Sequence, residues 1–192
     1  MLTGKQINAL ASITSNNAPH LRFIVLDNNG VQEAAMPDYE ARSYGSPFNC
    51  ARLWATDGHC LMTYTLEGVL GPHEPTAYCV ETTLAKLPAR HKLVIDDERR
   101  LADDRGYYLN LFDVHIPSID VVVPSYEFTS EAPRQGFNPA LIQRVMKALV
   151  GVTPKVALNG SIAAEFQFGG TSLSPTKIEY GPTMAIVMPC RL

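Results

Sequence analysis

The feature that most constrains this sequence is one pattern that recurs three times, an amphipathic helix followed by a group of short strands. In the first pass, Thr3 is the expected N-cap of a helix over residues 3–15. Asp57-Gly58 predicts a tight hairpin turn, because glycine takes a positive φ without strain and aspartate bonds to its own backbone. The strands predicted in this pass are residues 21–26, 50–56 and 60–66. Such a repeat implies that neighbouring units bury their apolar faces against one another.

The second pass begins after a break rich in glycine and proline at residues 71–75. It holds a short helix predicted over residues 82–87, which Pro88 ends. The predicted strands are residues 92–96, 99–102, 107–112 and 118–124. Two acidic groups, at residues 96–98 and 103–104, fall between these strands. We interpret them as solvated hairpin turns, and a metal site is the alternative.

The third pass opens with Phe137-Asn138-Pro139, in which Asn138 is the expected N-cap and Pro139 takes the first helical position. Apolar residues then recur at helical spacing through Leu149. The strands predicted to follow are residues 155–158, 163–168, 176–180 and 184–188. Pro189 should stop the last strand because it has no backbone N–H, and the apolar final residues predict a docked end.

These passes predict an α+β protein with basic helices on one face and antiparallel sheets on the other. Residues 1–125 are predicted to form one domain of two repeats, divided at about residue 70 into 1–70 and 71–125. Residues 126–136 have the composition of a linker, and residues 137–192 form the third repeat. An odd number of repeats leaves one of them without a partner inside the chain.

Composition excludes several classes of protein. Apolar residues make up 46% of the 192 residues, which is enough for a sizeable core. No apolar run is long enough to cross a bilayer and no leader is recognisable, so we expect a cytoplasmic protein. The four cysteines show no Cys-x-x-Cys pair and no histidine at ligand spacing, so we expect reduced thiols, no metal and no cofactor.

Charge is divided unevenly along the chain. The helical stretches 3–15, 81–92 and 137–149 carry six basic residues and one acid, a net +5, so the remaining residues carry −8 of the total −3. The six basic residues are Lys5, Lys86, Arg90, Lys92, Arg144 and Lys147. Basic helix faces of this kind meet the phosphates of DNA without reading its bases. The alternative is that they are ordinary solvated side chains.

Three segments taken together resemble the bacterial DNA polymerase III beta subunit, the replicative sliding clamp, in a shortened form such as a phage or mobile element would carry. They are Ala55-Thr-Asp-Gly-His-Cys-Leu61, Gly136-Phe-Asn-Pro with the helix after it, and the ending Met184-Ala-Ile-Val-Met-Pro-Cys-Arg-Leu192. Residues from about 22 to 124 resemble the middle domain of that family, and residues 137–192 resemble the second half of its last domain.

The resemblance implies a function in DNA replication. Clamps of this family are non-catalytic processivity factors that encircle duplex DNA, with helices lining the hole and strands forming the outer sheet. A family chain has six such half-domains and two chains close the ring, so three repeats here imply a homotetramer. The implied partners are double-stranded DNA, bound without sequence preference, and a DNA polymerase and clamp loader, bound through short hydrophobic peptides.

The resemblance also implies two sets of site residues. The six basic residues above would face DNA. The peptide pocket of the family corresponds here to Thr56, His59, Leu61, Pro124, Val187, Met188, Cys190 and Arg191. Two positions depart from the family, because Cys60 stands where arginine is usual and Cys190 where methionine is frequent. Methionine and aliphatic side chains suit a slot that accepts several related peptides.

Other classes of protein remain open from sequence. The chain would be a clamp-derived interaction protein if it binds clamp-binding peptides or another clamp without encircling DNA. The pocket residues would be ordinary core and turn residues if no peptide binds them. Asp57, His59 and Cys60 suggest a Cys-His enzyme, but residues this close around a hairpin point in different directions, so we expect no catalysis.

Overall fold

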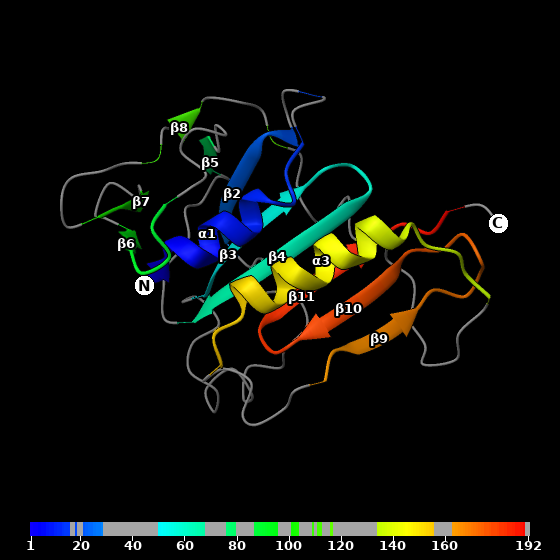
Figure 1. The fold of residues 1–192 in the computed structure, drawn as a ribbon. Coiled ribbons are helices and arrows are strands. Elements are labelled where there is room, and N and C mark those ends of the chain that lie inside the picture. Colours follow the sequence, from blue (N-terminus) through cyan, green and yellow to red (C-terminus); the bar gives the residue numbers. More distant parts are fainter. Residues whose placement is uncertain are drawn as a thin grey trace, which may run out of the picture.

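The computed structural model describes residues 1–15, 18, 21–28, 50–67, 76–79, 87–95, 101–103, 109, 111–112, 116, 134–155 and 163–190. Within these residues two helices, α1 (Gly4–Ala11) and α3 (Pro139–Val152), run side by side in opposite directions across one face of a large sheet (Figure 1). All strand pairs are antiparallel. The structure is therefore the predicted α+β arrangement of helices on one face of antiparallel sheets.

The described strands form two sheets. In spatial order the large sheet contains β8 (Leu111–Phe112), β5 (Thr76–Cys79), β2 (Phe23–Asn28), β3 (Cys50–Thr56), β4 (Cys60–Glu67), β11 (Thr183–Val187), β10 (Thr176–Tyr180) and β9 (Glu165–Phe168). The small sheet contains β1 (Leu2–Thr3), β6 (Lys92–Ile95) and β7 (Leu101–Ala102).

Helix α1 starts where the sequence predicts. The Thr3 side chain accepts from the Gln6 backbone, and the Gln6 side chain accepts from the Thr3 N–H at 2.9 Å, which is a complete capping box. The helix ends at Ala11, earlier than residue 15. The hydroxyl groups of Ser12 and Thr14 donate to carbonyl groups three residues back, at 2.6 and 2.8 Å, and such bonds compete with helix continuation.

Helix α3 also has the predicted cap. The Asn138 side chain accepts from the Ala140 N–H at 3.0 Å, and Pro139 occupies the first turn. The helix continues to Val152, one turn beyond the predicted end at Leu149.

The β3–β4 hairpin matches its prediction closely, because its turn is determined locally. Gly58 has φ of 87°, a conformation that favours glycine. The Asp57 Oδ1 atom accepts from the backbone N–H groups of His59 and Cys60, both at 2.8 Å. The two strands pair from Thr56↔Leu61 outward.

The segments predicted as the first and third repeats lie side by side in the structure. β4 pairs with β11 in the register Leu61↔Ile186, which joins strands far apart in sequence into one sheet. α1 packs against α3 so closely that a Cβ atom added to Gly151 would lie 2.7 Å from the Ala9 Cβ atom. The predicted division of the chain at residues 70, 125 and 137 stays a prediction.

The segment predicted as the second repeat contains β5 and β8 of the large sheet and β6 and β7 of the small one. β1 was not predicted; it pairs with β6 through Leu2↔Leu93 and sets α1 in place. The predicted helix 82–87, apart from Leu87, and the predicted strand 118–124 lie outside the described residues, as does most of the predicted strand 155–158.

Alternating strand positions place side chains in two separate cores. The larger core lies between the helices and the sheet, and it contains Ile24, Leu53, Met62, Leu149 and Val187 among others. A smaller cluster lies on the opposite face of the sheet. Its buried members are Phe23, Val25, Trp54, Leu61, Ala77 and Ile186.

Candidate functional site

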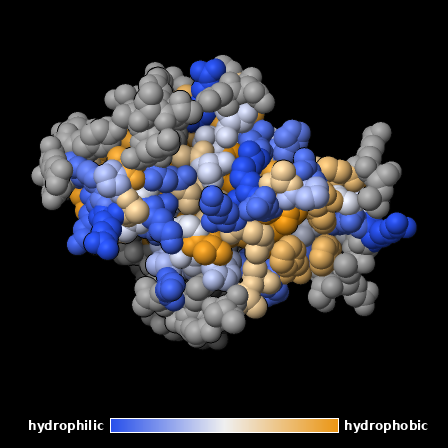
Figure 2. All heavy atoms as spheres, in the orientation of Figure 1, coloured by the Kyte–Doolittle hydropathy of each residue, from blue (hydrophilic) through white to orange (hydrophobic). Residues whose placement is uncertain are grey.

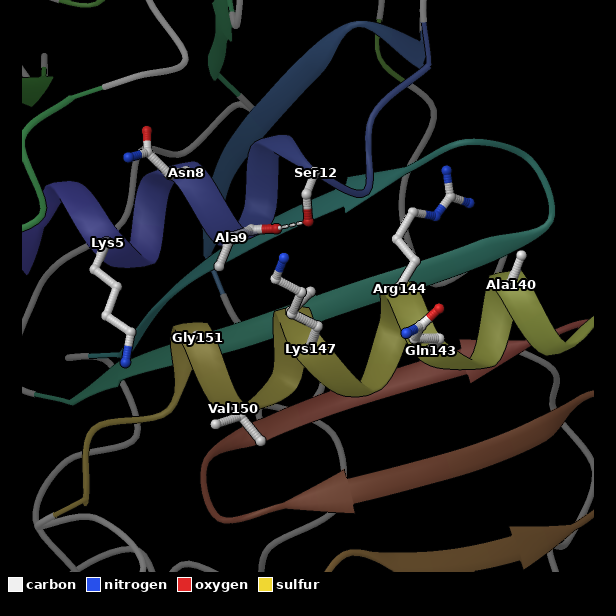
Figure 3. A pocket seen from close by; sticks show the side chains of 11 residues that line it. Lys5, Asn8, Ala9, Ser12, Ala140, Gln143, Arg144, Lys147, Val150 and Gly151 are labelled. Carbon is white, nitrogen blue, oxygen red and sulfur yellow. Dashed lines mark hydrogen bonds between the residues drawn. The ribbon is translucent and has the colours of Figure 1, made fainter.

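A groove runs between the two helices on the face of the molecule away from the sheet. It has a volume of about 740 Å³, and its walls carry polar and basic side chains (Figure 3). The lining side chains labelled in Figure 3 are Lys5, Asn8, Ala9, Ser12, Ala140, Gln143, Arg144, Lys147, Val150 and Gly151. Figure 2 shows hydrophilic side chains gathered along the helix pair on this face. We call this hollow the interhelical groove.

The interhelical groove is positively charged. Lys5 lies on α1, and Arg144 and Lys147 lie on α3, so both walls supply cations. No acidic residue lines it within the described part of the chain. The small residues Ala9 and Gly151 let the helices approach, and this approach sets the long side chains on both sides of one hollow.

The other predicted DNA-facing residues lie elsewhere. Arg90 lies in a turn, and Lys92 begins β6, which confirms the strand predicted from residue 92. Neither residue lies on a helix, although both were counted with the helical stretch 81–92. Pro88 has no N–H to continue a helix, and its carbonyl group instead accepts from the His91 N–H at 2.8 Å. Both basic side chains are exposed beside the start of α1, where Thr3 pairs with Lys92. Lys86 lies outside the described residues.

A second groove forms where the hairpin, the start of α3 and the C-terminal tail meet. It has a volume of about 440 Å³. Its lining residues are Asp57, His59, Asn138, Ala140, Leu141, Arg144, Met188, Pro189 and Cys190. All three sequence segments that carry the clamp resemblance contribute to it. We call it the tail groove.

The tail is held in this groove by backbone hydrogen bonds. The Met188 N–H donates to the His59 carbonyl group at 2.9 Å, and the Cys190 N–H donates to the Gly136 carbonyl group at 2.7 Å. The predicted docked end is therefore confirmed as far as Cys190, and residues 191 and 192 lie outside the described part.

The structure brings only some of the predicted pocket residues together. His59, Met188 and Cys190 line the tail groove. Thr56 stabilises the hairpin turn, since its hydroxyl group donates to the Cys60 carbonyl group at 2.7 Å. Pro124 and Arg191 lie outside the described residues.

Leu61 and Val187 do not line the tail groove, and they lie on opposite faces of the sheet. Leu61 belongs to the cluster on the outer face, next to Ile186, whereas Val187 is fully buried in the core beneath the helices. The alternation of side chains along β11 sends Ile186 and Val187 in opposite directions. Ile186 is thus the tail residue that lies with Leu61.

Asp57, Leu141 and Arg144 line the tail groove although the sequence did not assign them to it. The helical spacing assigned Leu141 to the core, and it is in fact only partly buried at the groove. Asp57 was interpreted as a turn residue alone. Its second role needs Arg144, which is distant in sequence, so local sequence signals could not reveal it.

Asp57 and Arg144 form an ion pair between the hairpin turn and α3. An Arg144 Nη2 hydrogen bond reaches the Asp57 Oδ2 atom, and the Asp57 side chain is 6% exposed. Burial raises the pKa of Asp57, but hydrogen bonds from the Cys60 and His59 backbones and from Arg144 outweigh it, so the pKa is lowered overall. Asp57 is therefore ionised at neutral pH and offsets the Arg144 charge.

The chemistry of the tail groove favours binding over catalysis. Burial, together with the charge of Asp57, raises the pKa of Cys60 to about 12, so its sulfur stays a thiol at neutral pH. Asp57 accepts hydrogen bonds from Arg144 and from the His59 and Cys60 backbones, which gives its carboxylate a structural role. Within the described residues, no three His, Cys, Asp or Glu side chains gather as metal ligands would. None of the helices that the structure describes has the length and apolar character needed to span a membrane.

The α+β fold, with paired helices over a continuous antiparallel sheet, is that of DNA sliding clamps. The DNA polymerase sliding clamp from Pseudomonas aeruginosa matches with a TM-score of 0.63 and 14% identity, over 100% of this chain and 66% of that chain. The DNA polymerase III beta chain from Streptococcus pneumoniae matches with a TM-score of 0.62 and 12% identity, over 100% and 64%.

The Helicobacter pylori beta clamp matches with a TM-score of 0.64 and 10% identity, over 98% of this chain and 64% of that chain. Thus this chain spans just under two thirds of the length of the clamps that it matches. No protein-family model matches the sequence, and no curated protein matches it either. At these identities the comparisons establish the fold of the chain.

Proposed function

We propose that the protein is a DNA sliding clamp, a non-catalytic processivity factor that encircles duplex DNA as a homo-oligomeric ring and tethers a polymerase. The observation that carries this proposal is the tail groove, where the hairpin, α3 and the tail meet. This groove adjoins the basic interhelical groove at Arg144. One chain thereby offers a surface for phosphates and a separate apolar slot for a peptide.

The interhelical groove is the proposed DNA surface. Lys5, Arg144 and Lys147 line it, and Arg90 and Lys92 are exposed beside the start of α1. Side chains of this type contact phosphates, so binding should be independent of sequence and weakened by salt. Affinity of this kind is on the order of 10⁻⁴ to 10⁻⁶ M, which permits sliding and leaves retention to ring closure.

The tail groove is the proposed peptide site. Met188 is 42% exposed, and it lies with Leu141 and Pro189 in an apolar slot whose rim carries His59 and Asn138. A solved structure of the Helicobacter pylori beta clamp contains a DNA ligase peptide. We propose that hydrophobic peptides from a polymerase and a clamp loader bind here, with a DNA ligase peptide of that kind as the test peptide.

Ring closure is proposed to need four chains. Three repeats in each chain give twelve in a homotetramer, the number that the resemblance to clamps requires. Among the strands that the structure describes, β8 and β9 have one neighbour each in the large sheet. We propose that these edges pair between chains, because an unpaired edge presents backbone groups to a second strand.

Two measurements test the function. Light scattering across a dilution series should give the mass of four 21.1-kDa chains, and the assembly should stay on circular DNA but leave linear DNA. A monomer or dimer at every concentration would contradict the ring. Lys5→Gln with Lys147→Gln should weaken duplex binding and leave binding of the test peptide unchanged.

A clamp-derived interaction protein is the second candidate. The observation in its favour is the Asp57–Arg144 pair, which offsets one of the cations in the interhelical groove. If the wild-type chain is such a protein, it should bind the test peptide but should not be retained on circular DNA. Peptide binding without DNA retention in the wild-type chain would favour the interaction protein over the sliding clamp.

A further inference from the structure

The two grooves share Ala140 and Arg144, and Arg144 is the charged residue of the two. It lines the interhelical groove beside Gln143 and Lys147, and it lines the tail groove beside Leu141 and Met188. Its side chain is 37% exposed, so solvent and ligands reach part of the guanidinium group. Figure 3 shows this side chain rising from α3 at one end of the interhelical groove.

The guanidinium group is committed to the tail groove in the present conformation. Nη2 donates to Asp57 Oδ2 and lies 3.8 Å from the Cys60 Sγ atom. The Nε atom is buried and has no hydrogen-bond partner. The pairing with Asp57 therefore leaves the Nε donor unsatisfied. An unsatisfied buried donor costs free energy, so the Arg144 side chain gains less from Asp57 than from an acceptor that would also bind Nε.

A DNA phosphate would be such an acceptor. Two phosphate oxygens can accept hydrogen bonds from one guanidinium group at the same time, which makes the contact strong. Lys5 and Lys147 would attract a phosphate into the interhelical groove by their charge. Arginine has a long side chain with several rotatable bonds, so a turn away from Asp57 requires no movement of α3. Asp57 lines only the tail groove, whereas Lys5 and Lys147 line only the interhelical groove. A guanidinium group that turns toward a phosphate between the two lysines therefore turns away from Asp57.

We propose that Arg144 couples the two grooves with opposite sign, because it serves either Asp57 in the tail groove or a DNA phosphate in the interhelical groove. This inference rests on the proposed function of both grooves. A peptide seated in the tail groove excludes water from the Asp57–Arg144 pair and strengthens it, since charges attract more strongly in a low dielectric. Bound peptide therefore withdraws one cation from DNA, and bound DNA weakens the peptide by the same factor.

The test is titration of a short fluorescent duplex at several salt concentrations. The variants are Asp57→Asn, Arg144→Gln and the double variant. Asparagine keeps the Oδ1 acceptor for the His59 and Cys60 backbones, so the hairpin turn is preserved. Glu179→Gln removes an equal charge from β10, which lies inside the sheet and outside both grooves, and serves as the matched control.

Freeing Arg144 should add one phosphate contact. Asp57→Asn should bind the duplex about fivefold more tightly, with a slope of log K against log salt that is steeper by up to about 0.9. In the Arg144→Gln background the same substitution should leave the slope unchanged. Glu179→Gln should keep the wild-type slope.

A measurement on the wild-type chain does not depend on how Asp57→Asn folds. A saturating concentration of the test peptide should make the wild-type salt slope shallower, so that it differs from the Asp57→Asn slope by about 0.9, the contribution of one phosphate contact. The peptide should leave the Arg144→Gln slope unchanged. Equal slopes with and without peptide in the wild type would overturn the coupling.

The outcomes separate the coupling from the function. In one outcome, duplex binding by the wild type depends on Lys5 and Lys147 while Asp57→Asn has the same salt slope as the wild type. That result would overturn the coupling and leave the proposed function standing. An Asp57→Asn effect of the same size with and without Arg144 also overturns it, since general charge would then explain the gain. Absence of duplex binding in the wild type and in Asp57→Asn overturns both the coupling and the proposed function.

Discussion

Asp57 receives hydrogen bonds from the hairpin backbone on one carboxylate oxygen and from Arg144 on the other. The turn geometry supplies the first two donors, and α3 supplies the third. Because these donors favour the charged form, the pKa of Asp57 lies below the ordinary value of 3.8 in spite of its burial. A single carboxylate therefore ties the first repeat to the third.

This linkage predicts an acid-sensitive contribution to stability. The folded chain binds fewer protons than the unfolded chain when the pKa is lowered, so the contribution is complete above the unfolded value and disappears as pH falls through the folded value. Asp57→Ala should lower the free energy of unfolding by about 2 kcal/mol at neutral pH, through lost and unsatisfied hydrogen bonds. The difference from the wild type should narrow below about pH 4.

Urea unfolding at neutral and acid pH measures this contribution. Glu165→Ala is the control, since its carboxylate is exposed on β9 and should have little effect at either pH. A difference between Asp57→Ala and the wild type that stays constant into the acid range would contradict the linkage.

At the scale of elements, the contact between α1 and α3 depends on two small residues. A Cβ atom at position 151 would approach the Ala9 Cβ atom to 2.7 Å, well inside ordinary contact. The Ala9 side chain has no flexible end that could move aside. The helices would have to separate, and the walls of the interhelical groove would move with them.

Gly151→Ala should therefore destabilise the chain although alanine is the better helix former. Overpacking costs about 1–3 kcal/mol, and helix propensity returns about 1 kcal/mol, so a net loss of about 1 kcal/mol is expected in thermal or urea unfolding. Gly170→Ala is the matched control, because nothing lies within 4 Å of its added Cβ atom. Ala9→Gly should offset part of the loss in the double variant, and additive effects would argue against direct contact.

Elements with local signals could be predicted from sequence, and those that depend on distant pairing could not. The caps at Thr3 and Asn138 and the turn at Gly58 act within a few residues, so their positions were correct. β1 has only two residues and depends on its pairing with β6, so its pattern is too short to recognise. Lys92 was correctly predicted to begin a strand, although its charge was counted with a helical stretch.

The tail groove illustrates the same limit for a site. The tail and the hairpin could be assigned to one pocket by resemblance, and His59, Met188 and Cys190 do lie together there. Which neighbouring residue points into the groove depends on the register of β4 with β11, and that register is a tertiary feature. A simple alternation along residues 184–188 would have set Ile186 and Val187 on opposite faces.

At the scale of the whole molecule, the large sheet has two different ends. β9 ends it on the side of the third repeat and β8 on the side of the second, within the described residues. Different edges that pair with each other make a head-to-tail contact, and such contacts close into a ring when the rotation between chains allows it. The sheet of one chain would then continue into the next.

This arrangement predicts a specific weak point in the assembly. Phe166 lies on β9, an edge strand of the described sheet, and is 38% exposed, so a chain that pairs with β9 would cover it. Phe166→Lys should shift the mass in light scattering from four chains toward one at the same concentration, because a buried lysine without a partner is costly. Leu173→Lys is the control, since Leu173 is 50% exposed in the turn between β9 and β10.

Phe166→Lys also separates assembly from the two grooves. The substitution lies outside the residues that line either groove, so binding of the test peptide should keep its wild-type affinity. Retention on circular DNA should be lost, because a single chain cannot enclose a duplex. A variant with wild-type mass at every dilution would remove β9 from the contact, and retention by a monomer would remove the ring itself.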